Sequence, residues 1–122
     1  MISFLNDKIH LPCNITSPSP DDNITLILWY KSDMKNSPIY TVDNRHIIVN
    51  PHHHPNELFG ERANFNLSVQ PALLSIEPVQ EDDEGEYRCR VDFRWGRTLT
   101  SIIKLKVIGM IMLLQNHTVN IL

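Results

Sequence analysis

The sequence predicts an all-β fold, a two-sheet antiparallel sandwich with Greek-key connections. Short runs of alternating apolar and polar residues recur along the chain, and segments rich in proline, asparagine, aspartate and serine separate them. Residues 83–89 form a D-x-G-x-Y-x-C pattern, and a cysteine and a tryptophan lie far upstream of it. With 122 residues there is room for one domain, and the net charge of −3 gives no reason to expect nucleic acid as a partner.

This pattern, with Cys13 and Trp29 upstream, resembles the signature of immunoglobulin domains. The resemblance implies that Cys89 bridges to Cys13 on the opposite sheet and that Trp29 packs against the bridge. Such a bridge requires an oxidising compartment, whereas the alternative, a cytosolic domain, would keep both thiols free.

The corner that precedes Cys89 completes the signature. The resemblance implies that Tyr87 turns its hydroxyl back onto the backbone there, in a tyrosine corner. Gly85 allows a tight backbone where a side chain would obstruct it. Asp83 is placed to pair with Arg62, an arginine at the start of an earlier strand.

The first strands follow from alternation. Residues 8–13 alternate and form the first expected strand, and residues 17–23 are a turn-rich loop. Residues 24–31 form the next strand, with Trp29 facing inward and Tyr30 outward.

The middle of the chain continues this pattern with one interruption. A strand is expected at 37–43, with Tyr40 facing outward, and residues 44–60 are expected to be an irregular excursion because they hold two prolines and three consecutive histidines. Strands at 62–69 and 72–77 follow.

A final hairpin is expected, with strands at 86–93 and 98–107 and a turn at 94–97. The stretch between Trp29 and Tyr87 is long enough for the additional strands of a variable-type domain, so this set fits better than the constant type.

The two ends do not fit a complete domain of this type. The domain is expected at residues 8–108, and residues 1–7 are expected to be a truncated remnant that lacks the first strand, strand A. Residues 109–122 are an unassigned tail, which reflects either a wrongly assigned exon boundary or a short hydrophobic segment that packs on the sandwich. No apolar run is long enough to span a membrane. We interpret the chain as a fragment that lacks its signal peptide and its first strand.

Four N-x-[ST] sequons predict N-glycosylation and hence the secretory route. They begin at Asn14, Asn23, Asn66 and Asn116. With the expected disulfide, they favour an extracellular location at the cell surface.

Three segments carry a narrower resemblance: 11–16, 26–31 and 38–43. They resemble the first immunoglobulin domain of the arthropod Sidestep family, over residues 9–107. The resemblance implies a cell-surface receptor of axon guidance that binds Beaten-path proteins and is membrane-anchored at full length.

One face of the expected sandwich is a candidate partner surface, because aromatic residues and arginine are enriched at interface hot spots. The residues expected on it are Leu28, Tyr30, Tyr40, Arg88, Arg90, Phe93 and Trp95. The alternatives are a strand that is apolar on both faces and a face covered by the tail. Sugars on Asn14 and Asn66 would lie on the opposite sheet and leave this face free.

Other chemistry is less well supported. Zinc binding by the histidine run 52–54, with His46 nearby, lacks an acidic or thiolate partner at ligand spacing. The acidic run 81–84 lacks the alternating oxygen ligands of a calcium loop. No nucleophile, base and acid are arranged for catalysis, so we expect no metal, no cofactor and no enzymatic activity.

The sequence therefore predicts an extracellular recognition or adhesion module that binds another protein, expected to be an immunoglobulin-domain protein. The alternative is a soluble, secreted immune-type domain that captures microbial or carbohydrate ligands through its loops.

Overall fold

A computed structural model describes residues 1–34, 37–45 and 51–109 of the chain. Within these ranges it contains nine strands and two 3-10 helices: β1 (Ile2–Phe4), β2 (Ile9–Cys13), β3 (Ile24–Lys31), β4 (Tyr40–Asp43), β5 (His52–Pro55), η1 (Gly60–Arg62), β6 (Ala63–Asn66), β7 (Ala72–Ile76), η2 (Glu81–Asp83), β8 (Gly85–Phe93) and β9 (Leu99–Ile108). Neither described helix is long and apolar enough to cross a membrane.

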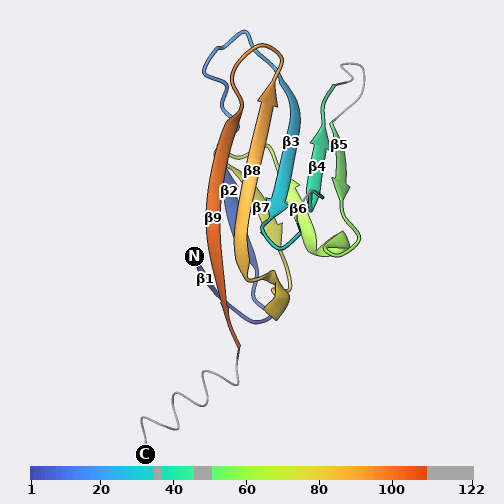
Figure 1. Ribbon diagram of the computed structural model, residues 1–122, viewed down its shortest axis with the longest axis vertical. Helices are drawn as coiled ribbons and strands as arrows, with labels where there is room; N and C mark the ends of the chain where they lie inside the picture. Colours follow the sequence, from blue (N-terminus) through green and yellow to red (C-terminus); the bar gives the residue numbers. More distant parts are fainter. Residues whose placement is uncertain (35–36, 46–50, 110–122) are drawn as a thin grey trace, which may run out of the picture.

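The strands form two sheets that pack face to face (Figure 1). The larger sheet has the order β1-β9-β8-β3-β4-β5, and the smaller has the order β2-β7-β6. All pairings are antiparallel except that of β1 with β9, which is parallel. The predicted all-β, two-sheet sandwich of immunoglobulin-like architecture is confirmed.

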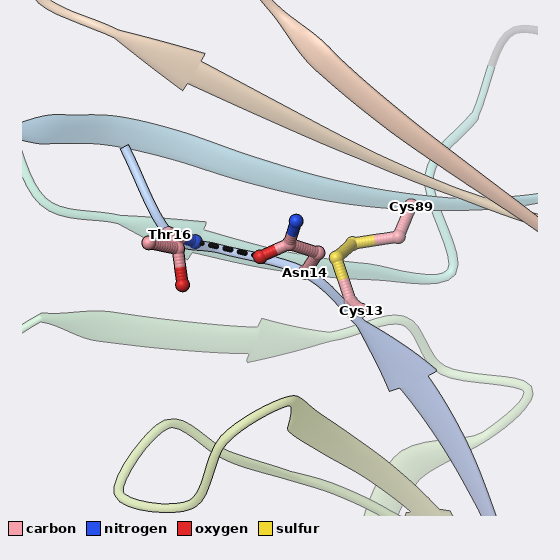
Figure 2. The surroundings of a disulfide bond; sticks show 4 residues. All are labelled: Cys13, Asn14, Thr16 and Cys89. Atoms are coloured by element: carbon pink, nitrogen blue, oxygen red, sulfur yellow. Dashed lines mark hydrogen bonds between the residues drawn. A yellow bond between two sulfur atoms is a disulfide. The ribbon is translucent and has the colours of Figure 1, made fainter. Parts of the chain in front are cut away.

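The sheets are joined by the expected disulfide between Cys13 on β2 and Cys89 on β8 (Figure 2). Trp29 of β3 is fully buried and meets Phe65 of β6 edge to face, with ring centroids 5.7 Å apart. Alternating inward residues of β2, β3, β7 and β8 supply much of the remaining core, and this alternation makes the four strands recognisable in the sequence. The disulfide and the aromatic pair thus span the two layers at the centre of the domain.

The corner before β8 has the expected geometry. The Tyr87 hydroxyl donates a hydrogen bond to the carbonyl oxygen of Asp83, and burial raises the pKa of Tyr87 far above its ordinary value. Gly85 has a φ of +148°, and a Cβ there would lie 3.2 Å from Nζ of Lys31. Glycine is therefore favoured by the backbone conformation, and any side chain there would also have to displace the end of the Lys31 side chain.

The N-terminal segment differs from the expected remnant without a strand. Residues Ile2–Phe4 form β1, which pairs with Lys106 to Ile108 of β9. The amide of Lys106 also donates to the carbonyl oxygen of Met1, at 2.9 Å. The edge of β9 offers free backbone groups, so a short extended segment gains hydrogen bonds there without needing an alternating sequence. Within the described residues no strand pairs with the outer edge of β2.

The expectation of an irregular excursion over 44–60 is wrong in part, because His52–Pro55 form β5 along the edge of β4. All four residues of β5 are exposed. Sequence alternation reveals a strand only where one face is buried, and β5 buries neither face. Residues 46–50 lie outside the described ranges, as does the tail from 110 to 122.

Candidate functional site

The candidate site is the outward face of the six-stranded sheet, the side turned away from β2, β7 and β6. On β3, Leu28 and Tyr30 alternate with the buried Ile27 and Trp29 and are half-buried, as expected for outward positions. Their cross-strand neighbours on β8 are Arg90, opposite Leu28, and Arg88, opposite Tyr30. The structure therefore brings four of the predicted surface residues together on two adjacent strands.

Ile102 on β9 extends this face and was missed by the sequence interpretation. It lies opposite Arg88 in the register of β8 and β9, so Ile102, Arg88 and Tyr30 form one row across three strands. The Ile102 side chain is 55% exposed, which is unusual for a large apolar residue in the middle of a strand. The signal was available, because Lys104 and Lys106 share its parity along β9. We define the outward face by Leu28, Tyr30, Arg88, Arg90 and Ile102.

Charges surround the apolar residues of the outward face. Nε of Arg90 lies 2.9 Å from Oδ1 of Asp92, and this hydrogen bond raises the pKa of the Arg90 guanidinium. Glu86 and Lys104 lie opposite each other across β8 and β9. Within the described residues Arg88 makes no ion pair, which leaves its guanidinium available to a partner.

A shallow hollow borders the outward face at the end of β3. Its lining residues are Tyr30, Lys31, Ser32, Met34, Glu86, Arg88 and Arg90. Among these lining residues Lys31 is buried, which the sequence analysis did not predict. Its side chain is 3% exposed, and Nζ reaches Oδ1 of Asp33 at 2.7 Å.

Two residues that were predicted for the partner surface do not lie on it. Tyr40 is 3% exposed and points into the core, where its hydroxyl lies 2.7 Å from Nδ1 of His53 and accepts a hydrogen bond from the amide of Phe65. Phe93 is 7% exposed because it has the parity of the buried Cys89 on β8. The prediction that Tyr40 and Phe93 face a partner is therefore wrong.

Trp95 lies in the turn between β8 and β9 and is 71% exposed, as expected for a surface residue. The Arg94 guanidinium stacks over its ring, 4.7 Å from the centroid. Asp22 fixes the turn, because its carboxylate accepts hydrogen bonds from the amides of Trp95 and Gly96. The turn therefore presents a solvent-exposed aromatic side chain at one end of the outward face.

Two predicted sequons share a local geometry on the other side of the molecule. Asn14 follows β2, and its Oδ1 accepts a hydrogen bond from the amide of Thr16 at 3.0 Å (Figure 2). Asn66 ends β6, and its Oδ1 accepts from the amide of Ser68 at 2.9 Å. Both asparagines are exposed, and each turn uses the side-chain oxygen. The side-chain amide nitrogen, which receives the sugar, has no hydrogen bond to any residue that the structure describes.

The remaining sequons lie elsewhere. Asn23 is exposed just before β3, and its carbonyl oxygen accepts a hydrogen bond from the amide of Arg94 in the β8–β9 turn. Asn116 lies outside the described residues, as does His46 of the zinc hypothesis. In the described part of the chain no group of three or more histidine, cysteine or acidic residues could hold a metal ion.

The acidic run at 81–84 stabilises the fold of this corner. Residues Glu81–Asp83 form η2, and the Asp83 carboxylate accepts a hydrogen bond from the amide of Gln80 as part of a capping box. Asp83 also pairs with Arg62, as predicted.

Comparisons with known proteins agree with this fold. The family model described as the immunoglobulin V-set domain matches residues 4–108. CXADR-like membrane proteins of Homo sapiens, Mus musculus and Rattus norvegicus are each 30% identical over 104 residues. The alignment covers 84% of this chain but only 27% of each relative. These comparisons do not support the narrower resemblance to the Sidestep family, and they indicate no enzymatic family.

Solved structures give the same architecture. The first immunoglobulin-like domain of human CD48 antigen superposes with a TM-score of 0.65 at 24% identity, covering 90% of this chain and 81% of that one. The extracellular domain of the voltage-gated sodium channel beta4 subunit superposes with a TM-score of 0.68 at 15% identity, covering 89% of each chain. At these identities the likeness shows the fold alone.

Proposed function

The chain belongs to the immunoglobulin V-set family, and we propose that it is an extracellular adhesion and recognition module that binds a second immunoglobulin domain through its outward face. The binding is non-covalent and proceeds by surface complementarity, without turnover. The full-length protein is placed at the cell surface by this proposal.

The row of Tyr30, Arg88 and Ile102 is the observation that carries the proposal. It lies across the middle of the sheet and has Leu28 and Arg90 beside it. Apolar groups with arginine among them are typical of the centre of an interface, where burial of the apolar area drives association and the guanidinium gives specificity. In the unbound domain Ile102 is 55% exposed to water, so its burial by a partner would contribute favourable free energy to binding.

Relatives of the chain support an adhesive role. The matching mammalian proteins are named membrane proteins, and the sodium channel beta4 extracellular domains are described as parallel homodimers that explain a role in cell-cell adhesion. The disulfide between Cys13 and Cys89 and the sequons at Asn14 and Asn66 are consistent with an oxidising, secretory compartment. Sugars at both asparagines would lie away from the outward face and leave it accessible.

Binding assays on the purified, disulfide-bonded domain test the proposal. The domain is coated on beads to measure aggregation through a second copy, and it is passed over an array of immunoglobulin ectodomains from the same organism. We expect Tyr30→Asp and Ile102→Asp to abolish the binding seen with the unmodified domain. Val69→Asp is the matched control, because Val69 is also an exposed apolar residue but follows β6.

Circular dichroism and thermal unfolding must show that each variant is folded. Failure of the unmodified domain to bind a second copy or any ectodomain overturns the proposed function. If binding survives both Tyr30→Asp and Ile102→Asp, the adhesive role stands, but the outward face is not the surface that binds.

Capture of a ligand by the loops is the second candidate, and the exposed Trp95 under Arg94 favours it. A sugar on the adjacent Asn23 would crowd the same turn, which argues for the sheet face instead. Trp95→Ala separates the two candidates, since it removes loop binding and leaves Leu28, Tyr30 and Ile102 in place.

A further inference from the structure

The edge strand β5 carries three consecutive histidines whose side chains divide between the two faces of the sheet. His53 lies opposite the buried Val42 of β4 and reaches the Tyr40 hydroxyl on the inner side. His52 and His54 therefore point to the outer side, the side of their opposite residues on β4. Both are exposed, and β5 forms one edge of the six-stranded sheet in the described structure.

The two outer histidines are already close to each other. Their rings stack with centroids 6.0 Å apart and an angle of 22° between the ring planes. When two imidazole nitrogens bind the same zinc ion, the distance from each nitrogen to the ion is about 2.0–2.1 Å. Small rotations of two exposed side chains would bring a nitrogen of each ring to a common ion, without any movement of the backbone.

We propose that His52 and His54 form a two-histidine site for a divalent transition metal ion of the zinc, copper and nickel class. Imidazole nitrogen suits these ions, whereas calcium and magnesium require oxygen ligands. Asp43, opposite His52, holds the Arg45 guanidinium at 2.8 Å and 3.0 Å. No third protein ligand is described, so water fills the remaining positions and the ion exchanges readily.

The site does not depend on the proposed adhesive function. It requires only the strand conformation of β5. The sequence analysis expected an irregular loop at these residues and therefore did not predict the spacing of the two histidines. The strand places every second side chain on one face, and this spacing turns a histidine run into a chelating pair.

Zinc titration of the tag-free, disulfide-bonded domain tests the site by isothermal calorimetry and by NMR of the histidine rings. We expect one zinc ion per chain and shifts of the His52 and His54 ring signals. Replacement of one ligand removes the chelate effect, so His52→Asn and His54→Asn should each weaken binding by about 100-fold. His10→Asn is the control, because His10 is an exposed histidine on β2, bonded to Ser75.

Since both ligands are exposed, the variants should unfold at the temperature of the unmodified domain. Zinc binding that is equal in His54→Asn and the unmodified domain would overturn the proposal. So would ring shifts confined to other histidines, or no saturable uptake of zinc by the folded domain.

Discussion

Arg62 of η1 and Asp83 of η2 form a bidentate ion pair. Nη1 of Arg62 lies 2.7 Å from Oδ2 of Asp83, and Nη2 lies 3.0 Å from Oδ1. The Asp83 side chain is only 3% exposed and also accepts a hydrogen bond from the amide of Gln80. This pair ties η1 to η2, and its hydrogen bonds raise the pKa of the Arg62 guanidinium.

Arg62→Ala should destabilise the domain by about 3 kcal/mol, because it leaves the Asp83 carboxylate buried without its cation. Urea unfolding at neutral pH measures the loss. Arg45→Ala is the control, since water screens the exposed pair of Arg45 with Asp43 and a much smaller change is expected. Equal losses in the two variants would contradict a special role for the buried pair.

Gly85→Ala should cost about 1–3 kcal/mol of folding free energy, because the residue must keep a φ of +148° and its Cβ would press on the Lys31 side chain. The same urea experiment applies. Gly109→Ala is its control, since a Cβ there meets no atom within 4 Å. A Gly85→Ala domain as stable as the unmodified one would show that the corner relaxes.

Much of this architecture could be predicted because its residues have fixed roles in the core. Cys13, Trp29, Tyr87 and Cys89 are each defined by a buried partner, so their spacing in the sequence indicates the fold. The segment 24–31 has a buried face and was predicted with the observed bounds. β1, whose one buried side chain is that of the polar residue Ser3, and β5, which buries no residue, gave no such signal.

The candidate face was predicted less completely, for two physical reasons. Phe93 and Ile102 follow the alternation of their strands, so extending the parity from Cys89 and from Lys104 would have placed both correctly. Tyr40 is different, because it and the preceding Ile39 are both buried. Alternation does not hold across the start of β4, and only the packing against β6 shows which way Tyr40 points.

Sugar placement gives a steric test of the outward face. Thr100→Asn combined with Ile102→Thr creates a sequon on β9, where both positions are exposed. Expressed through a eukaryotic secretory route, this variant should be glycosylated, folded and unable to bind in the bead and array assays. Asn66→Gln, which removes the Asn66 sequon beyond β6, should leave binding unchanged. Mass spectrometry reports occupancy, and normal binding by the fully occupied β9 variant would place the contact elsewhere.

The buried tyrosines predict the response of the domain to alkaline pH. Burial raises the pKa of Tyr40 and of Tyr87 in the folded state. Below pH of about 10, the ordinary pKa of tyrosine, both are neutral in the folded and unfolded chains, and their contribution to stability is fully present. Above it the unfolded chain ionises first, so stability falls as pH rises toward the folded pKa values.

Tyr40→Phe should reduce the slope of this fall by up to about 1.4 kcal/mol per pH unit, because one of the two groups is removed. At neutral pH the variant should be less stable by about 1–3 kcal/mol, since the amide of Phe65 loses its acceptor. Urea unfolding at a series of pH values from neutral to strongly alkaline separates these two effects, and the neutral value serves as the baseline. An unchanged slope would mean that Tyr40 ionises equally well in the folded and the unfolded chain, which its burial between β4 and β6 argues against.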